Sequence, residues 1–394
     1  MGGERRALYK SWVLHPLHHL WRALPAAPRR AGLARALAWV APRPDRAPPV
    51  APGLAVAGEL DRASGLGEGA RLMLEGLAAL GVPGWAARPG GAVPPPGVPL
   101  VIHVAPPLYA LALLRLGRRI VRGRRVIGYW AWELPVVPHA WRIGLGLAHE
   151  IWVPSRFSAE ALEPLLPGRV RVVAHPVAVR ARVPALPRAA LGIAETTVVT
   201  FVSFNLASSF ERKNPLGAIA AHALAFGARM DRVLLMRVMN PGDFPDDFAR
   251  LQAAAAPWPN VRLDTRTLSA AEQAGTMAAC DIVLSLHRSE GFGLVPAEAM
   301  LAGLPVVATD WSGTQDFLLP GTAALVPARL IPVQDPRGVY DMPGAVWAEP
   351  DIAVAAAHLR RLADDGTARQ ALGEAGLKHA GRLLGTDGLN AVLG

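Results

Sequence analysis

Hydrophobic positions in this chain form short continuous runs that alternate with longer stretches in which apolar residues recur at helical spacing. Short runs of this kind are typical of strands that are buried on both faces. The alternation of strand and helix predicts a parallel sheet covered by helices. In the first half of the chain we predict strands at 54–57, 100–104, 125–129, 151–153 and 170–174, and helices at 70–80 and 107–116.

The same alternation begins again after residue 196 and continues to the end of the chain. Because β-branched and apolar residues dominate its short runs, a second parallel sheet is expected. The predicted strands are 197–204, 233–238, 261–263, 281–286 and 305–309. The predicted helices are 215–226, 246–256, 270–279, 296–301, 352–364 and 368–384.

The two alternating regions predict an α/β fold with two Rossmann-like, doubly wound domains that face a central cleft. We place the N-terminal domain at 53–182 and the C-terminal domain at 190–394, whose last helix packs back on the first domain. Residues 181–195, rich in Pro, Ala and Arg, form the predicted linker. Ligands of such sheets bind at the carboxyl ends of the strands, so the cleft is the expected site.

Positive charge is concentrated in an N-terminal extension, residues 1–52. The net charge is +10, and residues 1–50 hold nine basic and two acidic residues, a balance of +7. Trp12, Trp21 and Trp39 lie among these arginines. Two interpretations stay open: an interfacial segment on anionic lipid, or a solvated extension that folds back on the domains.

Composition also limits the class of protein. A single cysteine, Cys280, excludes an internal disulfide framework and a Cys-rich metal site. Pro16 and three histidines interrupt the N-terminal apolar run, so no secretory signal is expected. The chain has no uninterrupted apolar stretch of about 18 residues, so no transmembrane helix is expected. We therefore expect a cytoplasmic protein, with peripheral attachment to the inner face of the plasma membrane as the open alternative.

The strongest chemical signal lies in the loop between strand 281–286 and helix 296–301. Gly291 and Gly293 let backbone N–H groups approach a ligand just before a helix N-terminus, a combination that binds diphosphate. Glu290 precedes these glycines, and Glu298 follows it by eight positions. Carboxylates on either side of an anion site fit the hydroxyls of a sugar and a ribose, which predicts a sugar nucleotide. The alternative is one capping and one solvated glutamate.

This segment, Glu290-Gly-Phe-Gly-Leu-Val-Pro-Ala-Glu298 followed by Ala-Met-Leu-Ala-Gly-Leu-Pro-Val-Val-Ala-Thr, closely resembles the E-x7-E signature of retaining GT-B glycosyltransferases of family GT4. The resemblance covers the C-terminal half and, more weakly, residues 54–180. It implies that Glu290 contacts the donor sugar and acts in catalysis, and that Glu298 binds the ribose. It also implies that the diphosphate is held by the amides of Gly291, Phe292, Gly293 and Leu294.

Adjacent cations after strand 197–204 fit the same ligand. Arg212 offers a planar fork and Lys213 a point charge for a leaving diphosphate, although an ordinary surface pair is the alternative. The segment resembles the family's phosphate-binding loop but lacks its commoner glycine-rich form. Because lysine occurs only three times in the chain, its presence here favours function.

The N-terminal domain offers candidates for the opposite side of the cleft. Residues 64–69 predict a glycine-rich turn, whose spacing does not fit a dinucleotide fingerprint. The family resemblance implies that Gly65 and Gly67 of this turn approach the donor phosphate or the acceptor across the cleft. His103 ends a strand, and the family resemblance implies a catalytic position near the reacting sugar. The alternative for His103 is a structural histidine. Trp132 and Glu133 follow strand 125–129 and suit acceptor recognition, and their alternative is an aromatic corner of the core.

Six arginines between positions 115 and 125, with no acid among them, suggest an anionic lipid or a lipid-diphosphate acceptor, or else a solvated face. No nucleic-acid-binding module is recognised.

The resemblance implies a metal-independent hexosyltransferase without a cofactor. Its donor would be GDP-mannose or a UDP-hexose, and its acceptor a glycan or a polyprenyl-diphosphate-linked glycan in surface polysaccharide synthesis. The alternatives are a catalytically silent GT-B membrane scaffold and another GT-B enzyme such as a sugar-nucleotide epimerase.

Overall fold

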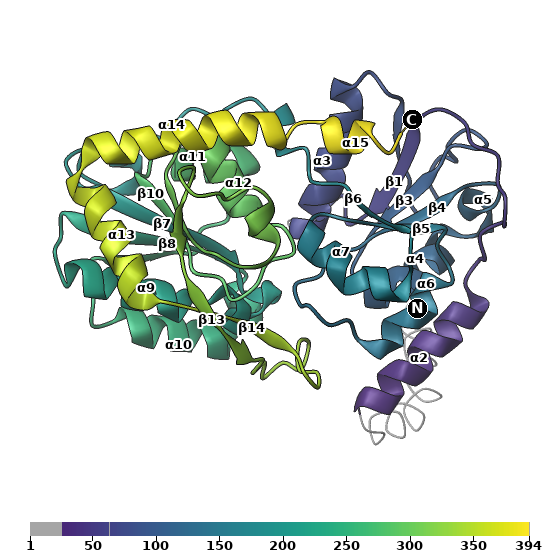
Figure 1. Cartoon of the computed structure of the whole chain (residues 1–394), viewed down its shortest axis with the longest axis horizontal. Helices are drawn as coiled ribbons and strands as arrows, with labels where there is room; N and C mark the ends of the chain where they lie inside the picture. Colours follow the sequence, from purple (N-terminus) through teal and green to yellow (C-terminus); the bar gives the residue numbers. More distant parts are fainter. Residues whose placement is uncertain (1–25, 63, 394) are drawn as a thin grey trace, which may run out of the picture.

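The computed structural model describes residues 26–62 and 64–393, which form two α/β domains side by side (Figure 1). The N-terminal sheet has six strands in the order β2-β1-β3-β4-β5-β6, and all its neighbouring strands pair in parallel. Its strands are β1 (Leu54–Gly58), β2 (Gly84–Ala86), β3 (Leu100–His103), β4 (Val126–Tyr129), β5 (Glu150–Val153) and β6 (Val170–Val172). Its helices are α2 (Ala26–Val40), α3 (Gly65–Ala79), α4 (Tyr109–Leu116), α5 (Arg118–Val121), α6 (Arg142–Leu145) and α7 (Arg156–Leu162).

The C-terminal sheet also has six parallel strands, in the order β12-β11-β10-β7-β8-β9. Its strands are β7 (Val198–Asn205), β8 (Arg232–Met239), β9 (Val261–Asp264), β10 (Ile282–Ser285), β11 (Val306–Thr309) and β12 (Ala324–Val326). The accompanying helices are α8 (Phe210–Lys213), α9 (Pro215–Phe226), α10 (Pro245–Ala255), α11 (Ala270–Ala278), α12 (Leu294–Leu301), α13 (Ile352–Asp364), α14 (Gly366–Leu383) and α15 (Asp387–Asn390). The alternating pattern thus produced two parallel sheets, as the sequence predicts.

The predicted turn at residues 64–69 is wrong, because helix α3 begins at Gly65. Ser64 is its N-cap and accepts a hydrogen bond from the N–H of Gly67 at 3.1 Å. A side chain at Gly69 would collide with the rings of His103 and His175. The glycines here therefore allow close packing of a helix, whereas the sequence analysis assigned them to a loop.

An antiparallel hairpin was not predicted. Strands β13 (Ala328–Pro332) and β14 (Val346–Pro350) pair with each other, apart from the two main sheets. The hairpin leaves the C-terminal domain between β12 and α13, yet Tyr340 and Trp347 belong to the hydrophobic core of the N-terminal domain. It lies at the lower edge of the interdomain boundary in Figure 1. The hairpin therefore joins the two domains.

Part of the N-terminal extension is a helix. α2 packs against α4 and α6 of the N-terminal domain, and its Ala38 is buried in that domain's core. Trp39 is 79% exposed, whereas Trp12 and Trp21 lie outside the described residues. Among the helices of residues 26–62 and 64–393, none has the length and hydropathy needed to cross a membrane.

The chain crosses between the domains twice, and the two crossings touch. The first connects β6 to β7, and the second connects α14 to α15, which packs on α3 with Leu389 in the core beneath it. The backbone N–H of Ala178 in the first crossing donates to the carbonyl of Leu384 in the second at 2.9 Å. Both crossings therefore run along one edge of the molecule, at the top of Figure 1.

Candidate active site

The loop between β10 and α12 presents free backbone donors at the domain boundary. Gly293 is the N-cap of α12 with φ +100°, a left-handed conformation that glycine adopts without strain. Within the described chain, no hydrogen bond uses the four consecutive N–H groups that begin at Gly291 and end at Leu294. Free amides at a helix N-terminus attract anions. The geometry therefore fits the predicted diphosphate cradle.

A second loop, which the sequence analysis missed, holds this cradle in place. Ser312 accepts a hydrogen bond from the N–H of Glu290 at 2.8 Å, and the N–H of Gly313 donates to the carbonyl of Glu290 at 2.9 Å. A side chain at Gly313 would collide with the carbonyl of Gly291. Ser312 has φ +71°, an uncommon conformation for a serine. The only sequence signal for this second loop was the Ser312-Gly313 pair, which follows the predicted strand 305–309.

Arg212 and Lys213, at the end of α8, form ion pairs with Glu290. Arg212 Nη1 lies 3.1 Å from Glu290 Oε2, and Lys213 Nζ is in contact with Glu290 Oε1. Burial alone would raise the pKa of Glu290, but Lys213 and Arg212 together lower it to about 2. Glu290 is therefore ionised, and both cations are partnered by it in the structure.

Arg212, Lys213 and Glu290 form a charged cluster, which Glu133 of the N-terminal domain joins. Glu133 Oε1 lies 3.6 Å from Arg212 Nη2, and Glu133 Oε2 accepts a hydrogen bond from the Tyr340 hydroxyl at 3.2 Å. Burial raises the pKa of Glu133, and Arg212 opposes that shift. The ring of Trp132 stacks on Tyr340 with centroids 5.5 Å apart. Both predicted acceptor-side residues thus lie at the boundary, whereas Tyr340 was not predicted.

Further hydrogen bonds join the two domains around the cluster. Ser155 Oγ donates to the carbonyl of Gly291 at 2.6 Å, and Ser289 Oγ donates to the carbonyl of Glu133. Arg156 pairs with Asp316 at 2.9 Å. The domains are therefore in a closed arrangement. The loop after β4, which carries Trp132 and Glu133, contacts the loop between β10 and α12, residues 286–293, which we call the donor loop.

Glu298 lies on α12, on the side that faces α3. Burial and the charge of Glu68 raise the pKa of Glu298 to about 7, and Arg180 partly opposes them. A side chain at Gly65 would come within 4.0 Å of Leu294 Cδ1, so Gly65 does approach the donor loop. Gly67 instead packs against the carbonyls that follow β1, away from this loop. The structure thus brings one of the two predicted glycines to the boundary.

His103 is deeply buried and stacks on Tyr129 with centroids 4.2 Å apart. Neither of its ring nitrogens has a hydrogen-bond partner in the described chain. Burial and His175 hold the pKa of His103 well below its ordinary value, so the ring is neutral. His175, which the sequence analysis missed, makes the edge-on contact with Phe292 of the donor loop, at 4.9 Å. Of these two histidines, His175 is the one whose ring packs against the loop between β10 and α12.

A comparison with family models finds one match within the C-terminal domain. Residues 229–342, which carry the loop between β10 and α12 together with Glu290 and Tyr340 but not Arg212, Lys213 or Glu133, match the family described as glycosyl transferases group 1. The match is confined to this segment of the chain. The resemblance drawn from residues 290–309 is thereby confirmed. No curated protein sequence is significantly similar to this chain.

Solved GT-B structures confirm the predicted fold class over most of the chain. HepE of Anabaena, crystallised with UDP and glucose, superposes with a TM-score of 0.59 at 13% identity, covering 87% of this chain and 98% of its own. WaaG, a glycosyltransferase involved in lipopolysaccharide biosynthesis, gives 0.55 at 16% identity, with coverages of 86% and 98%. Sucrose-phosphate synthase of Thermosynechococcus elongatus gives 0.60 at 17% identity, with coverages of 86% and 97%. At these identities the likeness concerns the fold.

Proposed function

We propose that this GT-B protein transfers a hexosyl group from a nucleotide-diphosphate sugar to a hydroxyl of a glycan or lipid-linked acceptor, with retention of configuration. One observation carries the proposal: Arg212, Lys213 and Glu290 meet beside four free amides at the N-terminus of α12. Two cations and a row of N–H groups suit a diphosphate, and the carboxylate suits a sugar hydroxyl. The solved structures of HepE with UDP and with UDP-glucose support a nucleotide-sugar donor.

The residues present favour electrostatic catalysis. As the sugar–phosphate C–O bond breaks, negative charge grows on the diphosphate, where Lys213, Arg212 and the amides stabilise it. The acceptor oxygen forms the new bond on the same face of the sugar, and its proton passes to the leaving phosphate oxygen. The step needs no protein nucleophile and no cofactor. Glu298 would hold the ribose, and Glu290 the donor sugar.

A donor screen tests this proposal. We expect one of GDP-mannose, UDP-glucose, UDP-galactose and UDP-N-acetylglucosamine to raise the melting temperature in the presence of EDTA, and to be hydrolysed slowly. A ligand at 100 times its Kd stabilises a protein by about 2.7 kcal/mol. Glu298→Ala should abolish the shift. If no nucleotide sugar shifts the melting temperature, even with liposomes present, the silent scaffold becomes the better interpretation.

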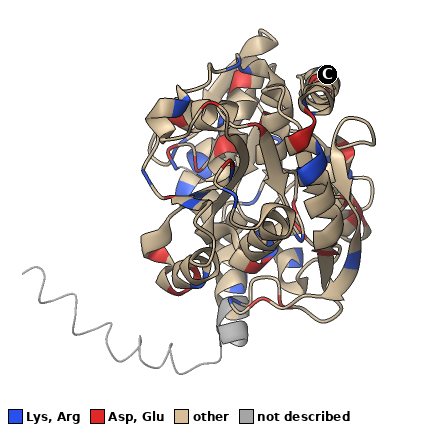
Figure 2. Ribbon diagram, turned by 90° about the vertical axis from the view of Figure 1, so that its left-hand side faces the viewer, with Lys and Arg blue, Asp and Glu red and all other residues tan. Residues whose placement is uncertain are grey.

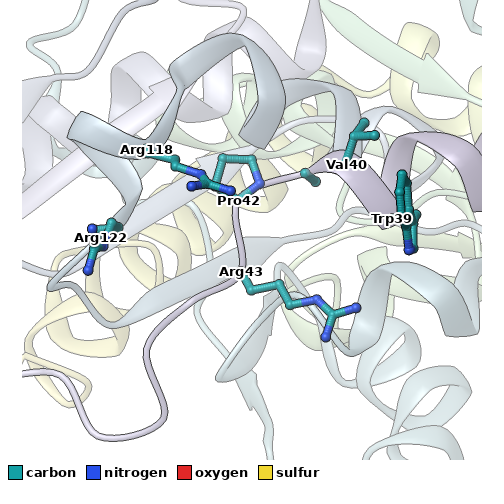
Figure 3. A pocket seen from close by; sticks show the side chains of 7 residues that line it. Trp39, Val40, Pro42, Arg43, Arg118 and Arg122 are labelled. Atoms are coloured by element: carbon teal, nitrogen blue, oxygen red, sulfur yellow. The ribbon is translucent and has the colours of Figure 1, made fainter.

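We also propose that the N-terminal domain rests on an anionic membrane surface. Arg43, Arg118 and Arg122 are exposed, have no ion pair within the described chain, and line a hollow of about 510 Å³ with Trp39 (Figure 3). By contrast, basic and acidic segments are interspersed on the side shown in Figure 2. Exposed tryptophan beside unpaired arginine suits a lipid interface.

Not every arginine of the sequence cluster is available to this surface. Arg124 is buried and donates to backbone carbonyls, including that of Ile120 at 2.8 Å. Arg125 pairs with Glu150 at 2.7 Å. The interpretation of the whole cluster as one free basic face is therefore corrected: these two arginines hold the domain together.

Charge reversal tests the membrane proposal. The double variant Arg118→Glu/Arg122→Glu should weaken binding to vesicles of phosphatidylglycerol and phosphatidylcholine by at least about thirtyfold, because each basic residue near such a surface contributes about 1 kcal/mol and each glutamate adds repulsion. Co-sedimentation measures the binding. The matched control, Arg361→Glu/Arg382→Glu, makes the same charge change on α13 and α14 and should bind like the wild type. Equal losses in both variants would contradict a specific surface.

A further inference from the structure

The β13–β14 hairpin carries a side chain from the C-terminal domain to the predicted acceptor side. β14 is tied to the donor loop, because the N–H of Ala348 donates to the carbonyl of Arg288 at 2.9 Å and Arg288 pairs with Glu349 at 2.8 Å. Buried Asp335 fixes the tip by accepting the N–H groups of Val339 at 2.8 Å and Tyr340 at 3.0 Å. The position of Tyr340 is therefore built into the fold.

Tyr340 makes three different contacts at the cluster. Its hydroxyl donates to Glu133 Oε2 at 3.2 Å, its ring stacks on Trp132, and the Arg212 guanidinium lies 5.6 Å from the ring centroid. The ring is buried, so these contacts allow it little freedom. A hydrogen bond to one carboxylate oxygen fixes the direction of the other.

Because Oε2 of Glu133 accepts the hydrogen bond of Tyr340, Oε1 is the oxygen that can accept a hydrogen bond from a substrate. Oε1 accepts no hydrogen bond from the described residues and lies 3.6 Å from Arg212, a predicted ligand of the leaving phosphate. In a same-face transfer, the incoming hydroxyl arrives beside the departing phosphate oxygen. An unoccupied carboxylate oxygen next to the phosphate-binding guanidinium is thus placed to accept a hydrogen bond from that hydroxyl.

We infer that Tyr340 is a positioning residue that orients Glu133 to receive the hydroxyl group attacking the donor sugar, whether it belongs to the acceptor or to water. The inference rests on the proposed function, since it needs a donor at Arg212 and Lys213. It adds a contribution of the C-terminal hairpin to the acceptor side, which otherwise belongs to the N-terminal domain. The carboxylate makes no covalent bond: the proton of the hydroxyl still passes to the leaving phosphate.

The test compares Tyr340→Phe with Tyr109→Phe in the full chain. Tyr340→Phe keeps the ring and its stacking and removes only the hydrogen bond to Glu133. Tyr109 is an equally buried tyrosine of the N-terminal core whose hydroxyl has no partner in the described chain, so its variant is the matched control. The readouts are the affinity for UDP-glucose and GDP-mannose by calorimetry, and the hydrolysis rate of each as a function of pH.

We expect Tyr340→Phe to reduce the hydrolysis rate about tenfold while the donor affinity stays within twofold, because a lost hydrogen bond to a charged group has about that effect. Glu133→Gln should reduce the rate further. The groups that face Glu133 are Arg212, Glu290, Lys213 and Tyr340. Since the hydroxyl of Tyr340 lowers the pKa of Glu133, its removal should move the acidic limb of the rate profile to higher pH.

Wild-type rates and an unchanged pH profile in Tyr340→Phe, with normal hydrolysis by the wild type, would overturn the inference and leave the proposed function standing. Equal loss of donor affinity and rate would also overturn it, because that result indicates a structural role. A wild type that neither binds nor hydrolyses any nucleotide sugar would overturn the proposed function, and the inference with it.

Discussion

Lys213→Ala is expected to slow donor turnover by two to three orders of magnitude while the protein stays folded. Lys213 is one of the two cations at the predicted diphosphate position, and its partner there is Glu290. Removing one group that stabilises developing negative charge typically lowers kcat by about 10²–10³. The rate of donor hydrolysis measures the effect, and a melting curve reports whether the fold is intact.

Lys378→Ala is the matched control, because Lys378 is exposed on α14 and forms no ion pair with the described residues. It should retain the wild-type rate. Arg212 is less suitable for this experiment, since it is buried between two carboxylates and its removal would destabilise the fold by about 3–5 kcal/mol. Full activity in Lys213→Ala would rule out the assigned role of this lysine.

Glu298→Gln is expected to stabilise the protein at pH 8 and to weaken donor binding about tenfold, the effect of losing a charged hydrogen-bond acceptor. Folding raises the pKa of Glu298 from 4.5 to about 7. A raised carboxyl pKa favours the protonated form, so the contribution of Glu298 to stability is fully present below pH 4.5 and is lost as the pH rises through 7. Glutamine has no charge to bury, and its gain at pH 8 is at most about 3 kcal/mol.

Urea unfolding at pH 4.5 and pH 8 distinguishes this result from a general packing effect. The two proteins should be equally stable at pH 4.5, and only the wild type should weaken toward pH 8. Glu160→Gln, at an exposed position on α7, should follow the wild type at both values. A gain in stability that is independent of pH would contradict the raised pKa.

The sequence predicted features whose causes are local. The apolar runs at 100–104 and 281–286 became strands because short buried runs in βαβ order have few other solutions. The donor loop was found because its glycines and both glutamates lie within nine residues. In both cases the residues that determine the feature are neighbours in the chain.

Features that depend on distant partners were missed or misread. Residues 64–69 were assigned to a turn because glycine disfavours helix, but the rings of His103 and His175 leave room only for a glycine at position 69 of α3. Tyr340 contacts Glu133 across 207 positions, and no spacing in the sequence signals such a pair. The same holds for Arg124, whose burial depends on carbonyls about 30 positions away.

The two interdomain crossings have a mechanical consequence. Because they touch at Ala178 and Leu384, they act as a single pivot at one edge, while the β13–β14 hairpin lies at the opposite edge in Figure 1. In a rigid body that turns about such a pivot, displacement grows with the length of the lever arm. A rotation that scarcely moves the crossings therefore moves the tip of the hairpin most, and we expect the contact between Tyr340 and Glu133 to be among the first to separate when the domains part.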